Sequence, residues 1–154
     1  MSDTIKNKIN KILINLKCAM KNALVPLDDY YNSFPEDIKA GLISFKSNDT
    51  DIKLSYFNCA SKTVNTVLAA EYCLSSLPEL MVEADRCEDV DTVMSCDRLL
   101  TSFEEMRKSL NEFTLRSEKL LSEVSPSFSG LINILNEFRI KLRNFIEYIN
   151  SFEF

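Results

Sequence analysis

The chain has few residues whose types and spacing suit catalysis. Its 154 residues include no histidine, the commonest general base, nucleophile activator and metal ligand in proteins. Its carboxylates fall on predicted helix exteriors among lysines and arginines, and none falls within an apolar stripe that would raise its pKa. Glycine-rich phosphate loops, nucleophile elbows and metal-ligand motifs are absent from the sequence. We therefore expect no enzymatic activity, no cofactor and no small-molecule substrate.

The cysteines form no CxxC pair. An odd, scattered set on predicted helical segments is typical of reduced, partly buried thiols, and it predicts a cytoplasmic protein. A cysteine nucleophile working without histidine is the less favoured alternative. The five residues are Cys18, Cys59, Cys73, Cys87 and Cys96.

Acidic residues gather between Glu83 and Asp97. A calcium-binding loop would need alternating acids, a central glycine and a terminal glutamate, and the glycine is missing here. We interpret the stretch as a solvated turn, followed by negative residues in the first turn of the next helix.

Composition favours an all-α protein. The chain has two glycines, four prolines and 45% hydrophobic residues, which fits helices joined by short loops better than a sheet rich in turns. Its length fits a single domain over residues 1–154. The net charge of -5 argues against a nucleic-acid partner.

The clearest element is a long amphipathic helix from Cys96 to Val124. Its apolar residues recur in alternating steps of three and four, as in a helix packed along its length on another helix. Ser117 is the one polar residue in that row, and replacing it with leucine is expected to stabilise the protein while loosening its choice of partner. The apolar positions are Cys96, Leu99, Phe103, Met106, Leu110, Phe113, Leu120 and Val124.

A second helix with the same spacing ends the chain. Ser125 and Pro126 are expected to start it, with serine as the cap and proline at the first helical position. Together the two helices predict a coiled-coil-like C-terminal hairpin. The second helix also carries surplus apolar residues, and at least one of Ile134, Ile140 and Tyr148 is expected to contact another helix or subunit. Its main row is Leu131, Leu135, Phe138, Leu142, Phe145, Ile149 and Phe152.

Three further segments complete the predicted bundle. One helix covers Asp3 to Val25 and is expected to end at Pro26. A short one follows the capping box at Ser33 and includes the region from Phe34 to Phe45. The third covers Asp51 to Leu77, is expected to lie centrally, and is kinked or broken at Pro78 before reaching Ala84.

The sequence thus predicts an elongated antiparallel bundle of about four principal helices plus a short one. Such a bundle favours a non-enzymatic adaptor or scaffold that binds protein partners, itself, or both.

The helix expected to lie centrally has a broad apolar face. Its predicted apolar positions are Ile52, Tyr56, Phe57, Ala60, Val64, Val67, Leu68 and Leu74.

The N-terminal helix suggests an alternative function. It carries five lysines against Asp3, a net charge of +4, while the rest of the chain carries -9. Basic amphipathic helices can lie on anionic membrane surfaces, as in BAR-like modules, an analogy of architecture alone. The residues expected to meet the membrane are Lys6, Lys11 and Lys17.

Overall fold

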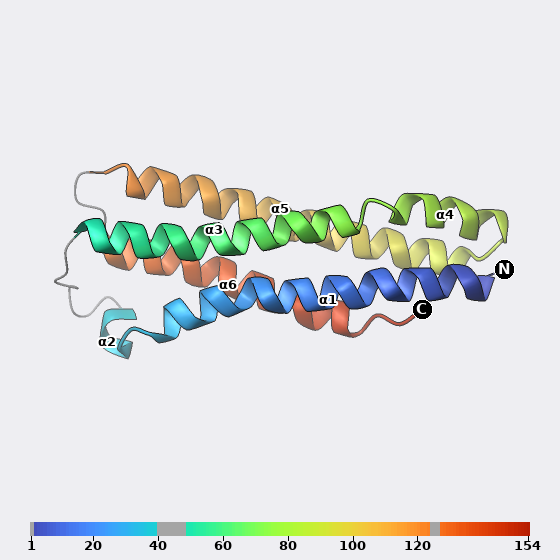
Figure 1. Cartoon of the computed structure of the whole chain (residues 1–154), viewed down its shortest axis with the longest axis horizontal. Coiled ribbons are helices and arrows are strands. Elements are labelled where there is room, and N and C mark those ends of the chain that lie inside the picture. Colours follow the sequence, from blue (N-terminus) through green and yellow to red (C-terminus); the bar gives the residue numbers. More distant parts are fainter. Residues whose placement is uncertain (1, 40–48, 124–126) are drawn as a thin grey trace.

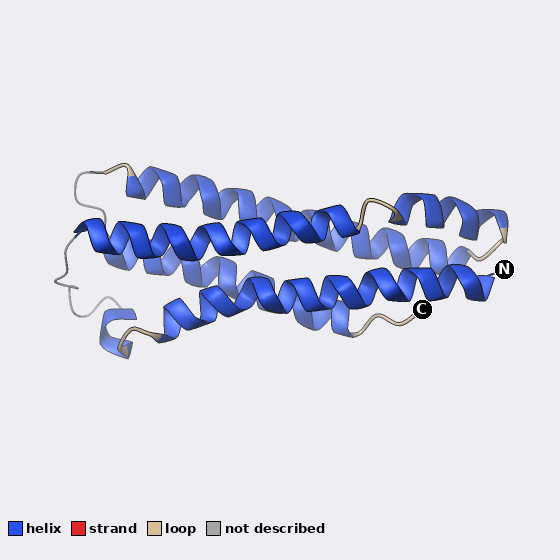
Figure 2. Ribbon diagram, viewed as in Figure 1, coloured by secondary structure: helices blue, strands red, loops and turns tan. Residues whose placement is uncertain are grey.

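The computed structural model describes residues 2–39, 49–123 and 127–154. Their regular secondary structure is α-helical, with no strand in those ranges, which confirms the all-α prediction (Figure 2). The helices are α1 (Ser2–Asn32), α2 (Glu36–Lys39), α3 (Asp49–Cys73), α4 (Leu77–Arg86), α5 (Val90–Leu121) and α6 (Phe128–Asn150).

The long helices lie along one axis, and successive ones run in opposite directions (Figure 1). α1 packs against both α3 and α6, while α5 packs against α6 and α4. At about 1.5 Å per residue, α1 and α5 each extend for roughly 45–50 Å. α3 and α5 make much less contact with each other than the α1–α3, α1–α6 and α5–α6 pairs do.

The apolar rows predicted for α5 and α6 form much of the core. Every predicted position from Cys96 to Phe113 is buried, and so are those from Leu131 to Ile149. Aromatic rings join the two helices: Phe113 stacks on Phe138 with centroids 5.1 Å apart, and Phe103 meets Phe145 edge-on at 5.9 Å. Val124 lies outside the described residues.

Pro26 does not end the first helix, contrary to the prediction from sequence. α1 continues through it to Asn32. A proline weakens the helix because it cannot donate to the preceding turn. Two α3 side chains supply hydrogen bonds there: the Thr63 hydroxyl donates to the Ala23 carbonyl at 3.0 Å, and the Cys59 thiol donates to the Pro26 carbonyl at 3.3 Å. Packing against α3 therefore adds hydrogen bonds to the helix beside the proline.

The extension of α1 also corrects the predicted capping box. Ser33 lies in the turn that ends α1, and its hydroxyl donates to the Tyr30 carbonyl at 2.6 Å rather than capping the next helix. The helix that follows begins at Glu36 and is described only to Lys39, so the rest of the predicted short helix lies outside the described residues.

Two other predicted boundaries are now defined. The helix expected to be kinked or broken near Pro78 is broken: α3 ends at Cys73 and α4 begins at Leu77, with Pro78 in its first turn. The cap of α6 is Ser127, whose hydroxyl accepts from the Gly130 backbone N–H at 3.1 Å. Ser125 and Pro126, the predicted start, lie outside the described residues.

The expectation that α3 is central is wrong for one of its faces. Tyr56, Val67 and Ala70 are fully buried, but Phe57 and Leu68 are 58% and 40% exposed. When a helix is apolar on most of its sides, all of those sides are buried only if other helices surround it. α3 packs extensively on α1 and little on α5, so part of its apolar surface faces solvent.

Candidate functional site

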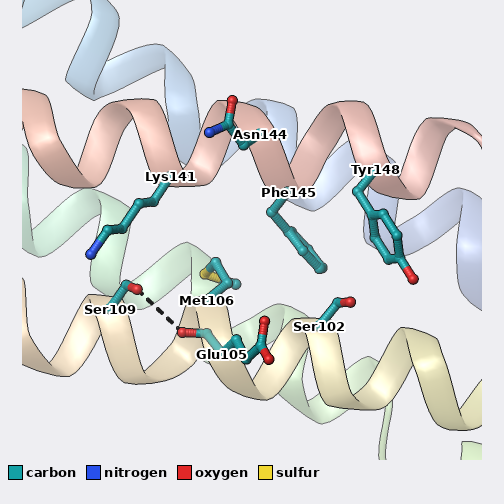
Figure 3. A pocket seen from close by; sticks show the side chains of 8 residues that line it. All are labelled: Ser102, Glu105, Met106, Ser109, Lys141, Asn144, Phe145 and Tyr148. Atoms are coloured by element: carbon teal, nitrogen blue, oxygen red, sulfur yellow. Dashed lines mark hydrogen bonds between the residues drawn. The ribbon is translucent and has the colours of Figure 1, made fainter.

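An open groove of about 470 Å³ lies between α5 and α6 (Figure 3). Its walls come from the outer edges of the two packed apolar rows, since residues beside a buried row line the surface where two helices meet. The residues from α5 are Ser102, Glu105, Met106 and Ser109, and those from α6 are Lys141, Asn144, Phe145 and Tyr148.

The groove combines an apolar floor with charged edges. Met106 and Phe145 are almost fully buried and present apolar atoms at its base. Glu105 extends from α5, while Lys141 extends from α6 on the opposite side (Figure 3). The Ser109 hydroxyl is bonded to the Glu105 backbone carbonyl at 3.2 Å, so the Glu105 carboxylate is not occupied by that contact. This lining matches an amphipathic ligand.

Tyr148 is the one member of the predicted α6 set that lines this groove. Its side chain is 37% exposed, and its ring meets Phe152 edge-on at 5.0 Å. Ile134 is buried to 6% exposure and lines a narrow cleft farther along the same helix pair. Ile140 is 48% exposed and lies on the surface. The structure therefore does not bring the three residues together as one patch.

The three predicted lysines also have different environments. Lys6 lies 3.9 Å from the Asp89 carboxylate at the start of α5. Lys17 donates to the Phe152 backbone carbonyl at 3.2 Å. Lys11 is exposed. Two of these charges therefore face other parts of the protein, while Lys8 and Lys21 are exposed like Lys11.

The C-terminal residues are hydrogen-bonded to α1. The Asn10 side-chain amide donates to the Phe154 carbonyl at 2.8 Å and accepts from the Phe154 backbone N–H at 3.1 Å. Phe152, whose carbonyl accepts from Lys17, also contacts the ring of the groove residue Tyr148.

Asp89, in the acidic stretch before α5, is the N-cap of that helix. The Asp89 carboxylate accepts from the Thr92 backbone N–H at 3.3 Å and from the Thr92 hydroxyl at 2.8 Å. This agrees with the predicted placement of acids at the start of the helix. Among the described residues, no group of three or more acidic or cysteine side chains is placed to hold a metal ion.

The cysteines are free thiols, as the sequence predicted. Burial raises the pKa of Cys59 to about 12 and the pKa of Cys96 to about 11. A nucleophilic cysteine needs a lowered pKa, because the thiolate is the reacting form. These two buried thiols are therefore suited to packing rather than to catalysis.

Sequence reasoning missed Glu105, Lys141 and the other polar residues of the groove. Their positions flank the apolar rows of two predicted helices, and that flanking position is the signal that could have identified them. Which flank of α5 meets which flank of α6 depends on helix rotation in the folded protein.

Comparisons with protein families, with curated proteins and with solved structures found no match for this chain. Within the described part of the chain, no helix is both long enough and apolar enough to cross a membrane.

Proposed function

We propose that this protein is a non-enzymatic adaptor or scaffold that binds an amphipathic helix of a partner protein in the groove between α5 and α6. The scaffold in this proposal is an elongated antiparallel bundle whose α5–α6 pair is a coiled-coil-like hairpin. The observation that carries the proposal is the pairing of an apolar floor, Met106 and Phe145, with opposite charges on its edges, Glu105 and Lys141.

The lining defines the chemistry of the partner. A helix that offers apolar side chains at steps of three and four would cover Met106, Phe145 and Tyr148. A basic residue on one flank would meet Glu105, and an acidic residue on the other would meet Lys141. Helix-in-groove binding is favoured because the groove runs between two helices that lie side by side and is open along its length.

The test replaces a small groove residue with a large charged one. Ser102→Arg projects into the groove from a partly exposed position and should leave the fold intact. Ile14→Glu is the matched control, because Ile14 is 64% exposed on α1 and does not line the groove. Proteins captured from cells by the wild type should be lost with Ser102→Arg and retained with Ile14→Glu.

Direct binding then completes the test. The helical segment of a captured protein should bind the purified wild type one to one, and nuclear magnetic resonance shifts should centre on Glu105, Lys141 and Tyr148. If the groove variant and the wild type bind the same proteins with the same affinity, the proposal is wrong.

Membrane association is the second candidate function. It is favoured by one observation: Lys8, Lys11 and Lys21 are exposed on α1. The apolar face of this helix is used in the core, where Ile9, Leu16 and other residues are fully buried. Any contact with an anionic surface would therefore be electrostatic, without insertion of the helix.

A further inference from the structure

The exposed side of α3 carries a second apolar row. Its residues follow steps of three and four, like the rows in α5 and α6, but they lie away from the buried residues Tyr56, Thr63 and Val67. Leu54 and Phe57 are each 58% exposed, Leu68 is 40% exposed and Tyr72 is 81% exposed. We call this row, with the partly exposed Ser61 and Val64 at its centre, the α3 stripe: Leu54, Phe57, Ser61, Val64, Leu68 and Tyr72.

Few residues of α3 near the α3 stripe are charged. Between Leu54 and Leu74 the only charged residues are Lys62 and Glu71. One flank of the stripe carries the uncharged Asn58, Asn65 and Ala69, and the other carries Lys53 and Glu71 near its two ends. A solvated helix face normally carries many charges, so this composition is typical of a surface that is covered by protein. In Figure 1, α3 lies at the front with no helix over it.

We propose that a second copy of this chain covers the α3 stripe, with the two α3 helices antiparallel across a twofold axis. In this arrangement Leu54 lies opposite Tyr72 of the second copy, and Phe57 lies opposite Leu68. Ser61 lies opposite Val64 at the centre, where small side chains let the helices approach closely. The stripe is thus self-complementary, as a twofold interface requires.

Charge favours the antiparallel orientation. Lys53 and Glu71 lie on the same flank of the stripe, near its opposite ends. An antiparallel pair brings Lys53 of one copy toward Glu71 of the other, whereas a parallel pair would place both Lys53 residues at one end of the interface and both Glu71 residues at the other, without pairing opposite charges. Lys53 already donates to the Glu123 carbonyl at 3.1 Å, and Glu71 lies 3.5 Å from Arg107. The Lys53 ammonium has three donors and the Glu71 carboxylate has several acceptor positions, so each can form a further hydrogen bond with the second copy.

The area is sufficient for a weak dimer. With roughly 200 Å² for a large exposed side chain, the four exposed stripe residues present on the order of 450 Å² per copy. Two copies would bury about 900 Å², near the lower limit of about 1,000 Å² for specific interfaces. An adjoining groove of about 220 Å³ between α3 and α5, lined in part by Phe57, Val64 and Leu121, adds to this surface. We expect a dissociation constant on the order of 10 µM.

The first test measures mass against concentration by sedimentation equilibrium. The wild type should pass from the mass of one chain to twice that mass as the concentration rises through the expected dissociation constant. Phe57→Lys and Leu68→Glu should each weaken the dimer at least tenfold. Ile14→Glu, an equally exposed apolar position outside the stripe, should not. Tyr72→Lys, at the most exposed position, tests the stripe with the least risk to folding.

The second test mixes two variants. In an antiparallel dimer, the lysine introduced by Phe57→Lys lies opposite the glutamate introduced by Leu68→Glu, and the remaining pair is the native Phe57 and Leu68. An equimolar mixture should therefore recover dimer that neither variant forms alone. Circular dichroism of each variant confirms that the helices are intact.

Three outcomes would overturn the proposal. The wild type could remain a single chain at about one hundred times the expected dissociation constant. A dimer could form but persist in all three stripe variants, which would place the interface elsewhere. The variants could lose the dimer without recovery on mixing, which would exclude the antiparallel register.

Discussion

The Tyr56 hydroxyl and the Ser117 hydroxyl lie 2.7 Å apart in the core, where they form a hydrogen bond between α3 and α5. Both residues are buried. Burial raises the pKa of Tyr56, and the hydrogen bond with Ser117 opposes that rise only in part. The one polar residue in the apolar row of α5 is therefore the partner of a buried tyrosine, on the side where α3 and α5 have little other contact.

This bond reverses the expectation that Ser117→Leu stabilises the protein. The substitution should lower the free energy of unfolding by about 1–3 kcal/mol, because it leaves the buried Tyr56 hydroxyl without a partner. Urea denaturation followed by circular dichroism measures the change. In a double-mutant cycle, Tyr56→Phe combined with Ser117→Ala should cost less than the sum of the two single changes. Simple additivity would show that the bond contributes nothing.

The hydrogen bond from Thr63 to Ala23 should stabilise the helix around Pro26. Thr63→Val keeps the shape of the side chain but removes the donor, and should cost about 1–3 kcal/mol. Pro26→Ala should raise the free energy of unfolding by up to about 3 kcal/mol, because alanine restores a helical donor. The alanine N–H at position 26 bonds to the Asn22 carbonyl, four residues earlier, and leaves the Ala23 carbonyl to Thr63. Thr63→Val should therefore cost about the same in the Pro26→Ala background as in the wild type. A smaller cost in that background would show that the threonine bond compensates for the proline.

Phe138 should be among the residues that matter most for stability. It is 2% exposed and stacks on Phe113 of the neighbouring helix. Phe138→Ala should lower the free energy of unfolding by about 3–5 kcal/mol, since it leaves a cavity in the core. Phe57→Ala is the control: that ring is 58% exposed, and below the concentration at which copies associate its loss should cost less than about 1 kcal/mol. Similar costs for the two changes would contradict the burial pattern.

Stability should fall in alkaline solution. The pKa values of Cys59 and Cys96 rise from about 9 to about 12 and about 11, because the fold buries both thiols. The unfolded chain therefore loses these protons first as the pH rises above about 9, and ionisation then favours unfolding until the pH passes the folded-state pKa values. Replacing both cysteines with alanine should reduce the fall in stability between about pH 9 and pH 11. A pH dependence equal to that of the wild type would contradict this account.

Vesicle sedimentation tests the membrane alternative. At low salt the wild type should sediment with anionic vesicles, where electrostatic attraction is strongest. The combined changes Lys8→Glu, Lys11→Glu and Lys21→Glu should abolish this binding, because those lysines are exposed. Lys17→Glu should have a smaller effect, since Lys17 contacts the Phe152 carbonyl. Failure of the wild type to sediment would remove membrane association as a function.

Local sequence was enough to establish the helical class and the buried rows of α5 and α6. Steps of three and four place residues such as Leu99, Phe113 and Phe138 on one side of a helix, whatever lies next to it. Because the chain has few glycines and prolines, helices were the structure most consistent with its composition. Negative residues at the start of α5 were also predicted, because their favourable interaction with a helix N-terminus depends on local sequence.

What each helix packs against was settled only by the folding of the whole chain. Pro26 lies within a helix that packs on α3, where Thr63 and Cys59 donate to the Ala23 and Pro26 carbonyls across separations of 40 and 33 residues in sequence. The broad apolar face of α3 and its expected central position predicted that Phe57 is buried, but neighbouring helices cover only part of that face and leave Phe57 exposed. Periodicity fixes which residues share a face, whereas the packing of distant segments determines which face is covered, because burial depends on the position of the neighbouring helices.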